Sequence, residues 1–205
     1  MKKLKNHKKI DLEEDCSLVG YSKSLNIDAF DCGDPDLNDF FHNDAFQYQD
    51  GLIGKTHAFI IDGTRDIVCA FTVSNDALRI DDKPRQARKS VRESIPESKV
   101  RWPAYPAVKI GRIGVDKSFS GSGIGSQAMD FVKGWFCDQG NKTGCRFITV
   151  DAYNNPKALG FYEKNDFSFL FGSETDELNY LNADRRTKYD EVKTRFMYFD
   201  LMRIM

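Results

Sequence analysis

Three glycines stand within five residues in the run Ser120-Gly121-Ser122-Gly123-Ile124-Gly125. Because a glycine has no Cβ, its backbone N–H can turn toward a bound anion. A helix should begin near Gly123, since apolar residues recur at helical spacing at Ile124, Ala128, Phe131, Val132, Trp135 and Phe136. The start of a helix adds free amides and the positive end of its dipole. The run therefore predicts a phosphate-binding loop, although a simple tight turn would use the same glycines.

The segments around this loop predict the elements that position it. An apolar strand, Ala107–Val115, is expected before the loop, and another, Cys145–Asp151, after its helix. Earlier in the chain, Asp34 is expected to cap a helix that begins at Pro35 and stops at Gly51. A hairpin is predicted from two apolar runs, 56–62 and 67–74, that are separated by Gly63.

The glycine spacing distinguishes this loop from two known kinds of phosphate-binding loop. It lacks the Gly-Lys-Ser/Thr of the Walker loop and the G-x-G-x-x-G of dinucleotide sites. It resembles the Arg/Gln-x-x-Gly-x-Gly/Ala loop of the GNAT acetyltransferases, with Ser120 in place of the first long side chain. A second motif of that family, Asn-x-x-Ala-x-x-Phe-Tyr-x-x-x-Gly-Phe, is matched from Asn155 to Phe167, with Asp166 where Gly is usual. The resemblance, over about residues 56–171, implies an α/β GNAT fold: a mixed, mostly antiparallel sheet with helices on both faces.

The same resemblance implies a reaction and its site. GNAT enzymes transfer the acetyl group of acetyl-CoA (coenzyme A) to a primary amine, and no metal is required. Backbone amides of the loop would bind the pyrophosphate, at Ser120, Gly121, Ser122, Gly123, Ile124, Gly125 and Ser126. Strand amides would polarise the thioester carbonyl at Ile113, Gly114 and Val115, where Gly114 suits a bulge. Asn155 would contact the pantetheine arm, and Tyr162 would protonate the leaving thiolate.

These roles have alternatives. Proton transfer from a phenol to a thiolate is uphill by roughly 2 kcal/mol, which is accessible for a general acid. Tyr162 could instead be a core tyrosine with a satisfied hydroxyl, and Asn155 could cap a helix that begins at Pro156. The general base is undetermined among the carboxylates near the motifs: Asp116, Asp151 and Glu163.

One motif near the start of the chain narrows the resemblance to a branch of the family. Phe30-Asp31-Cys32-Gly33, followed by Leu37 and Phe40-Phe41, is similar to the opening of the GNAT toxins of bacterial toxin–antitoxin pairs. Arg112–Asp116 also resembles their fourth strand. The resemblance implies an aminoacyl-tRNA as amine acceptor and a small antitoxin as partner; a homodimer is left open. A turn with Cys32 packed beneath it would explain the same motif. The alternatives are a small-molecule or protein amine as acceptor, or an acyl-CoA-binding module without turnover.

Two segments depart from the family pattern, and both are predicted to be insertions that shape the acceptor site: residues 77–105 and 173–194. Within the first, Arg79–Arg101 carries eight basic and four acidic side chains, a local net charge of +4. Four of the basic residues share one face of an expected helix: Arg85, Arg88, Lys89 and Arg92. This face could bind phosphates of RNA or of CoA, or it could simply be solvated.

Composition limits which other classes of protein are possible. The chain has 205 residues and a formal net charge of -1, so we expect one domain over residues 1–205 and no general affinity for polyanions. Five cysteines without a C-x-x-C pair, together with three histidines, predict neither a metal site nor a disulfide scaffold. No run of 18 apolar residues and no secretory signal is present, so we expect no membrane association and a reducing cytoplasm.

Overall fold

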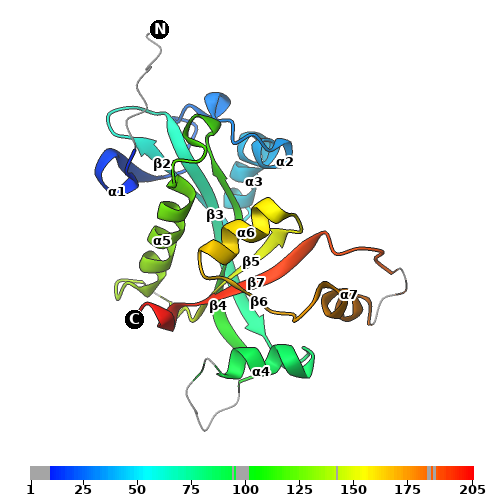
Figure 1. Ribbon diagram of the computed structural model, residues 1–205. Coiled ribbons are helices and arrows are strands. Elements are labelled where there is room, and N and C mark those ends of the chain that lie inside the picture. Colours follow the sequence, from blue (N-terminus) through cyan, green and yellow to red (C-terminus); the bar gives the residue numbers. More distant parts are fainter. Residues whose placement is uncertain (1–9, 94, 96–101, 142, 184–185, 187) are drawn as a thin grey trace. The chain divides into compact units, whose positions relative to one another are not determined.

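The computed structural model (Figure 1) describes residues 10–93, 95, 102–141, 143–183, 186 and 188–205. Its strands form a seven-stranded sheet in the order β1-β2-β3-β4-β5-β7-β6. The strands are β1 (Cys16–Gly20), β2 (Lys55–Ile61), β3 (Ile67–Arg79), β4 (Ala104–Val115), β5 (Phe147–Tyr153), β6 (Ser168–Phe169) and β7 (Thr194–Asp200). β4 and β5 are parallel, whereas β1–β2, β2–β3, β5–β7 and β6–β7 are antiparallel. The predicted mixed, mostly antiparallel α/β fold is confirmed.

The chain divides into two compact units. The first contains residues 10–74 and Gly111–Val132, and the second contains Asn75–Ile110 and the described residues from Lys133 onward. β3, β4 and α5 (Ile124–Cys137) contribute residues to both units. The single-domain organisation expected for the chain stays a prediction.

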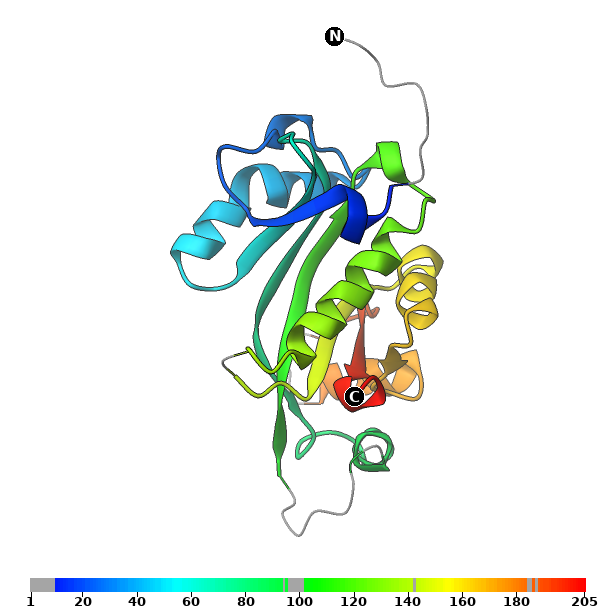
Figure 2. The ribbon, with the colours of Figure 1, turned by 90° about the vertical axis from the view of Figure 1, so that its left-hand side faces the viewer.

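In the first unit, a helical stretch covers one face of the strands (Figure 2). It consists of α2 (Pro35–Asp39), a π-helical turn η2 (Phe40–Asp44) and α3 (Ala45–Asp50). The Asp34 side chain accepts a hydrogen bond from the Leu37 amide at 3.1 Å, which confirms the predicted cap. Phe30, Phe40 and Phe41 are buried with Ala58 and Ala70 of the hairpin. The short helices before this stretch are α1 (Leu12–Asp15) and η1 (Ile27–Ala29).

α5 covers the other face of these strands in the first unit. The ring of Phe59 on β2 meets Phe131 edge to face at 5.1 Å, whereas the neighbouring Ala58 faces the helical stretch. Ile124, Ala128 and Val132 are buried, as the helical spacing predicts. Met129 is fully buried as well, although it was not placed on the predicted stripe.

The second unit is built around an apolar cluster on one side of its strands. Ala87 and Val91 of α4 (Arg85–Glu93) pack there with Phe147 and Tyr198, and Tyr180 of α7 (Glu174–Asn182) lies at its edge. A buried ion pair holds α7 to β7, in which Arg195 Nε donates to Glu177 Oε2 at 2.6 Å. Further helices are α6 (Pro156–Lys164), which packs on β5, and η4 (Leu201–Arg203). Both predicted insertions thus contain a helix.

Across the described residues, no helix is long and apolar enough to cross a membrane. Within the same residues, no group of three or more His, Cys, Asp or Glu side chains is arranged to hold a metal ion.

Candidate functional site

The glycine run forms a loop between η3 (Lys117–Phe119) and the first residue of α5, Ile124. Gly121 has a φ of 76° and Gly123 a φ of 90°, in the left-handed region that favours glycine. A Cβ at either position would have no heavy atom within 4 Å outside its chain neighbours. Both glycines are therefore required by backbone conformation rather than by crowding.

Several loop amides are already used inside the loop. The Ser120 amide donates to Lys117 O and the Ser122 amide to Phe119 O, both at 3.2 Å. The Ser126 amide donates to Gly123 O at 3.0 Å. These three amides belong to the predicted pyrophosphate-binding set; in the structure they donate within the turn and the first helical turn, and their contact with a pyrophosphate stays a prediction.

The remaining amides of the loop have no such acceptor. Among the residues that the structure describes, none accepts a hydrogen bond from the amides of Gly121, Gly123, Ile124 or Gly125. Ile124 is anchored because its side chain is only 1% exposed, whereas Gly121 and Gly123 are exposed. Successive unpaired N–H groups at the start of a 14-residue helix fit an anion such as a phosphate.

The carboxyl end of β4, Gly111–Val115, lies in the same unit as this loop. The register of β4 with β5 runs from Ala107 to Lys109 and does not include Ile113, Gly114 or Val115. Gly114 is tightly enclosed, since a Cβ there would lie 3.0 Å from Cys32 Cβ and 3.2 Å from Phe41 Cε2. Close packing against Cys32 therefore explains this glycine, and the bulge expected there stays a prediction.

We predict that Gly114→Ala destabilises the fold. The added methyl group would overlap Cys32 and Phe41, and overpacking of this kind costs about 1–3 kcal/mol. Urea unfolding monitored by circular dichroism would measure the loss. Gly111→Ala is the matched control on the same strand, because its Cβ would meet only Thr72 O at 3.9 Å. Equal unfolding free energies for the two variants would contradict the packing explanation.

Asn155 and Tyr162 lie in the second unit, the first just before α6 and the second in the last turn of that helix. Asn155 Oδ1 accepts a hydrogen bond from the Ala158 amide at 2.9 Å, so the helix-cap alternative is confirmed. This contact uses the side-chain carbonyl, and a contact with pantetheine stays a prediction for Asn155.

Tyr162 is buried, with 9% of its surface exposed, and its ring packs edge to face against Phe161 and Phe167. Burial raises the pKa of the Tyr162 phenol, which therefore stays neutral at physiological pH. Within the described part of the chain, no residue forms a hydrogen bond with its hydroxyl. Among the described residues the Tyr162 hydroxyl oxygen is not a buried unpaired atom, so it reaches the surface although the ring is buried, and it is open to a ligand atom.

The three carboxylates considered as bases differ in their contacts. Asp116 is 8% exposed, and its two carboxylate oxygens accept hydrogen bonds from the amides of Ser118 and Asp31. Asp151 forms an ion pair with Lys109, and Glu163 is exposed on α6. Asp116 is therefore committed to holding its own loop, and the structure does not single out a base.

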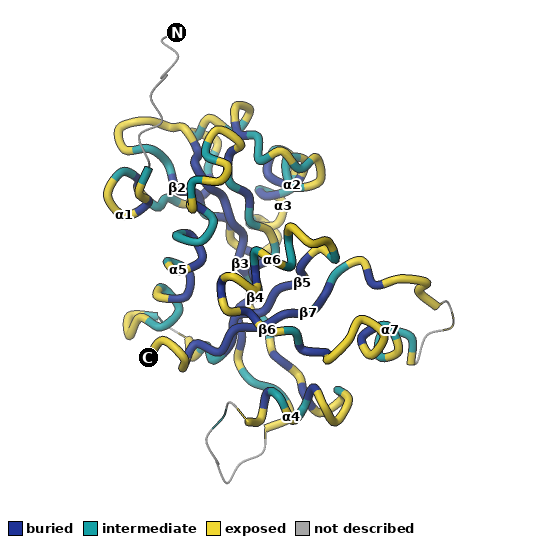
Figure 3. The backbone as a smooth tube through the Cα atoms, viewed as in Figure 1, coloured by how far each residue is buried: buried dark blue, intermediate teal, exposed yellow. Residues whose placement is uncertain are grey.

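The basic face predicted in the first insertion is present on α4 in the second unit. Arg85, Lys89 and Arg92 are exposed and Arg88 is half-buried, while Ala87 and Val91 pack in the apolar cluster. Along α4 the tube accordingly changes between buried and exposed colours (Figure 3). Lys89 contacts Glu93 at 3.5 Å. Lys99 and Arg101, counted in the predicted charge of this segment, lie outside the described residues.

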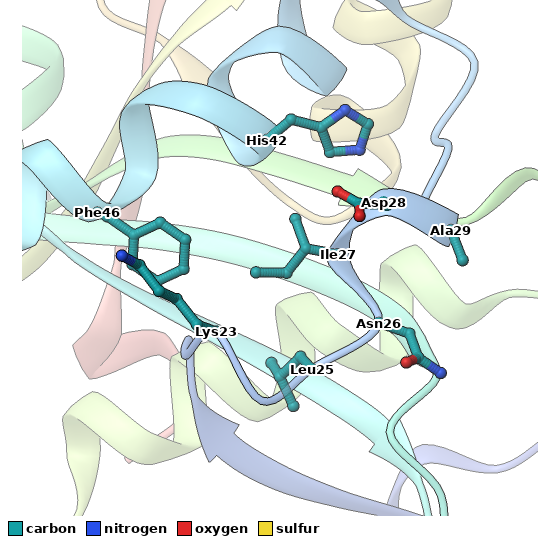
Figure 4. A pocket seen from close by; sticks show the side chains of 8 residues that line it. All are labelled: Lys23, Leu25, Asn26, Ile27, Asp28, Ala29, His42 and Phe46. Carbon is teal, nitrogen blue, oxygen red and sulfur yellow. The ribbon is translucent and has the colours of Figure 1, made fainter.

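A separate hollow of about 400 Å³ lies in the first unit (Figure 4). Its lining combines an amine, a carboxylate, a carboxamide and an imidazole with apolar groups, from Lys23, Leu25, Asn26, Ile27, Asp28, Ala29, His42 and Phe46. The Lys23 ammonium lies 5.7 Å from the Phe46 ring centre, and His42 Nε2 lies 2.9 Å from Phe30 O. Sequence reasoning singled out no site here, because these residues follow no motif.

Comparisons with known proteins agree with the motif reading. Residues 92–167 match the model of the Acetyltransferase (GNAT) family. A tRNA-acetylating toxin of Mycobacterium tuberculosis is 23% identical over 158 residues, which cover 77% of this chain and 86% of the toxin.

Solved structures show the same fold. AtaT complexed with acetyl-methionyl-tRNAfMet is similar with a TM-score of 0.61 at 19% identity, over 93% of this chain and 97% of that one. A mutant AtaT toxin bound to the C-terminus of the antitoxin AtaR and acetyl-CoA gives a TM-score of 0.59 at 18% identity, over 93% and 96%.

Proposed function

We propose that this chain, an acetyltransferase of the GNAT family, transfers the acetyl group of acetyl-CoA to the amino group of an aminoacyl-tRNA. The class of reaction follows from the family, and the acceptor is the step that we add. Two relatives support it: a tRNA-acetylating toxin by sequence, and AtaT complexed with acetyl-methionyl-tRNAfMet by fold.

One observation carries the donor site: the unpaired amides of Gly121, Gly123, Ile124 and Gly125 at the start of α5. Donors of this kind suit a pyrophosphate because each can meet a phosphate oxygen without a side chain. We assign the pyrophosphate of acetyl-CoA to these amides. The thioester carbonyl we assign to the amides of Ile113–Val115, which lie outside the register of β4 with β5.

Tyr162 is proposed as the general acid. When bound, acetyl-CoA supplies an activated acetyl thioester. As the amine nitrogen of the acceptor bonds to the acetyl carbon and the carbon–sulfur bond breaks, the Tyr162 hydroxyl gives its proton to the departing sulfur. The proton lost by the amine passes to solvent or to a base that we do not assign, and the Tyr162 phenolate regains a proton from solvent. The buried phenol with its free hydroxyl supports this role, because it is protonated and available.

The acceptor proposal also draws on α4. Arg85, Arg88, Lys89 and Arg92 give one face of a nine-residue helix several positive charges, although the whole chain has a net charge of -1. Such a local patch suits the phosphates of an RNA better than a small uncharged amine. We further propose a small antitoxin as a protein partner, since AtaT is bound to AtaR, and a cytoplasmic location.

The direct test is an acetylation assay with three acceptors: an aminoacyl-tRNA, the matching free amino acid, and a lysine-containing peptide. We expect [¹⁴C]acetyl transfer to the charged tRNA to exceed transfer to the other two at equal amine concentration. Preferential acetylation of the free amino acid or of the peptide would refute the acceptor. Acetyl-CoA binding without transfer to any amine would instead favour a non-catalytic module.

The basic face offers a second prediction. Replacing Arg85, Arg88, Lys89 and Arg92 by alanine should weaken charged-tRNA binding and reduce the salt dependence of turnover. The slope of log affinity against log salt is negative, and each lost phosphate contact should reduce its magnitude by about 0.7–0.9. Acetyl-CoA affinity should change little, because the glycine loop is on another segment.

A control variant separates this effect from net charge. Alanine at four other exposed basic positions, Lys55, Arg65, Arg186 and Lys193, removes the same charge. We expect a smaller change in the tRNA salt slope from this control. If both quadruple variants keep the wild-type slope, the α4 face is only solvated.

A further inference from the structure

A turn in the first unit holds the segment that leads into the glycine loop. The Asp31 amide donates to Asp116 Oδ2 at 3.0 Å, and the Lys117 amide donates to Asp31 O at 2.8 Å. Two hydrogen bonds of the Asp31 backbone, one to a carboxylate oxygen and one from a backbone amide, thus join the Phe30–Gly33 turn to the residues directly after β4. Both partners are distant in sequence from Asp31 but belong to the same unit.

The Asp31 side chain adds a second set of contacts. Its Oδ1 accepts hydrogen bonds from the Gly33 amide and from Asn38 Nδ2, both at 2.8 Å. Its Oδ2 pairs with Lys117 Nζ at 2.5 Å. The Lys117 ammonium, followed by Asn38 and the Gly33 amide, lowers the pKa of the Asp31 carboxyl, which remains ionised across the physiological range.

From Asp116 the contacts continue to the loop itself. Asp116 Oδ1 accepts from the Ser118 amide at 2.9 Å, and its carbonyl accepts from the Phe119 amide. The Ser120 amide then donates to Lys117 O, and the Ser122 amide to Phe119 O. A continuous series of hydrogen bonds therefore runs from Asp31 to the residue before Gly123.

The loop needs fixing at this end. Its other end is fixed by α5, where Ile124 is buried, but Gly121 and Gly123 retain the wide conformational freedom of glycine. A loop that samples several conformations binds a ligand more weakly, in proportion to the fraction of time spent in the competent one. An anchor before Gly121 would raise that fraction.

We propose that Asp31 is a positioning residue for the donor site. Its carboxylate fixes the turn and Lys117, so that the unpaired amides at Gly121, Gly123, Ile124 and Gly125 face a phosphate. The inference rests on the proposed function in one respect, that these amides bind acetyl-CoA. It assigns a role to the Phe30–Gly33 turn within the donor site, apart from the choice of acceptor.

Electrostatics alone predicts that removing Asp31 strengthens anion binding, whereas loss of a positioning residue predicts that it weakens anion binding. The two explanations can therefore be separated by one measurement. Asp31→Ala deletes a negative charge from the unit that carries the phosphate site and releases the positive charge of Lys117. Both changes favour binding of an anion. If Asp31 has no positioning role, affinity for acetyl-CoA should be unchanged or higher; if it positions the loop, affinity should fall despite the gain in positive charge.

The experiment is titration calorimetry of acetyl-CoA into the full chain, with turnover at saturating acetyl-CoA measured in parallel. We expect Asp31→Ala to raise Kd about tenfold, as a tenfold smaller competent fraction would, with kcat within about twofold of wild type. Asp31→Asn should fall in between, because it keeps an acceptor for Gly33 and Asn38 but not the ion pair. Asp36→Asn is the control, since Asp36 is exposed in the first turn of α2.

Asp31→Ala combined with Lys117→Met gives a double-mutant cycle. If the two side chains act together, the double variant should bind no more weakly than Asp31→Ala. Unchanged or tighter binding in folded Asp31→Ala and Asp31→Asn would overturn the positioning role. A wild-type protein that does not bind acetyl-CoA would instead refute the donor-site proposal, and a fall in Tm with unchanged Kd would show a structural role only.

Discussion

Gly123→Glu is expected to abolish binding of acetyl-CoA while the protein still folds. Gly123 is exposed, and its Cβ would meet no heavy atom within 4 Å, so the side chain has room. It would place a carboxylate beside the unpaired amides of Gly121, Gly123, Ile124 and Gly125, where we assign the pyrophosphate, and like charges there would repel. Its φ of 90° adds backbone strain of about 1–3 kcal/mol for any residue with a Cβ. Calorimetry with CoA would measure the loss.

Two variants separate charge from strain. Gly123→Gln has the same size and the same backbone strain without the charge, so it should keep more affinity than Gly123→Glu. Gly63→Glu places the same residue at another glycine with positive φ and open space, in the turn between β2 and β3. This control should unfold at a similarly lowered temperature and bind CoA normally. Wild-type affinity in a folded Gly123→Glu protein would exclude the glycine loop as the phosphate site.

The sequence was sufficient to predict this loop because its signals are local. Glycines with positive φ and an apolar stripe at helical spacing are properties of a few adjacent residues, and Gly121, Gly123 and Ile124 behave as predicted. The spacing of the glycines could not show which amides of the loop remain free to donate to a ligand. That depends on turn hydrogen bonds, such as those of the Ser122 and Ser126 amides, which follow from the particular turn that the backbone adopts.

Contacts between distant residues were not predictable in the same way. Asp31 and Lys117 meet although 86 positions separate them, and no period or motif links the two. The bulge expected at Gly114 stays a prediction, but its close packing against Cys32 and Phe41 was not foreseen, because it depends on how the turn and η2 pack on β4. For Cys32, the simpler reading of a residue packed beneath a turn was correct, while the resemblance correctly pointed to relatives that acetylate tRNA.

The second large effect is expected from Tyr162→Phe, which removes one oxygen atom and leaves the ring. The ring contacts with Phe161 and Phe167 should remain, so the fold and acetyl-CoA affinity should be close to wild type. Without a proton donor, the thiolate must leave unprotonated or take its proton from water. Loss of a general acid commonly lowers rates by about 10²–10⁴-fold, and we expect kcat with charged tRNA to fall in this range.

Burial has two consequences for this step. The raised pKa keeps the phenol protonated at neutral pH, which favours its role as an acid, but it also makes the phenol a weaker one. The second effect is offset because a thiolate in the same buried surroundings is destabilised by the same loss of hydration. The proton transfer therefore stays feasible although the phenol is less acidic than tyrosine in water.

Tyr198→Phe supplies the matched control for this variant. Tyr198 lies in the same unit, is 7% exposed, and also has a phenol whose pKa is raised by burial, but it packs in the apolar cluster with Phe147. Removing the Tyr198 hydroxyl should leave kcat within about twofold of wild type, because substitutions away from the reacting groups usually have small effects. If single-turnover kinetics show equal rates for Tyr162→Phe and wild type at saturating acetyl-CoA, Tyr162 is a core residue and proton transfer to the sulfur depends on another group or on water.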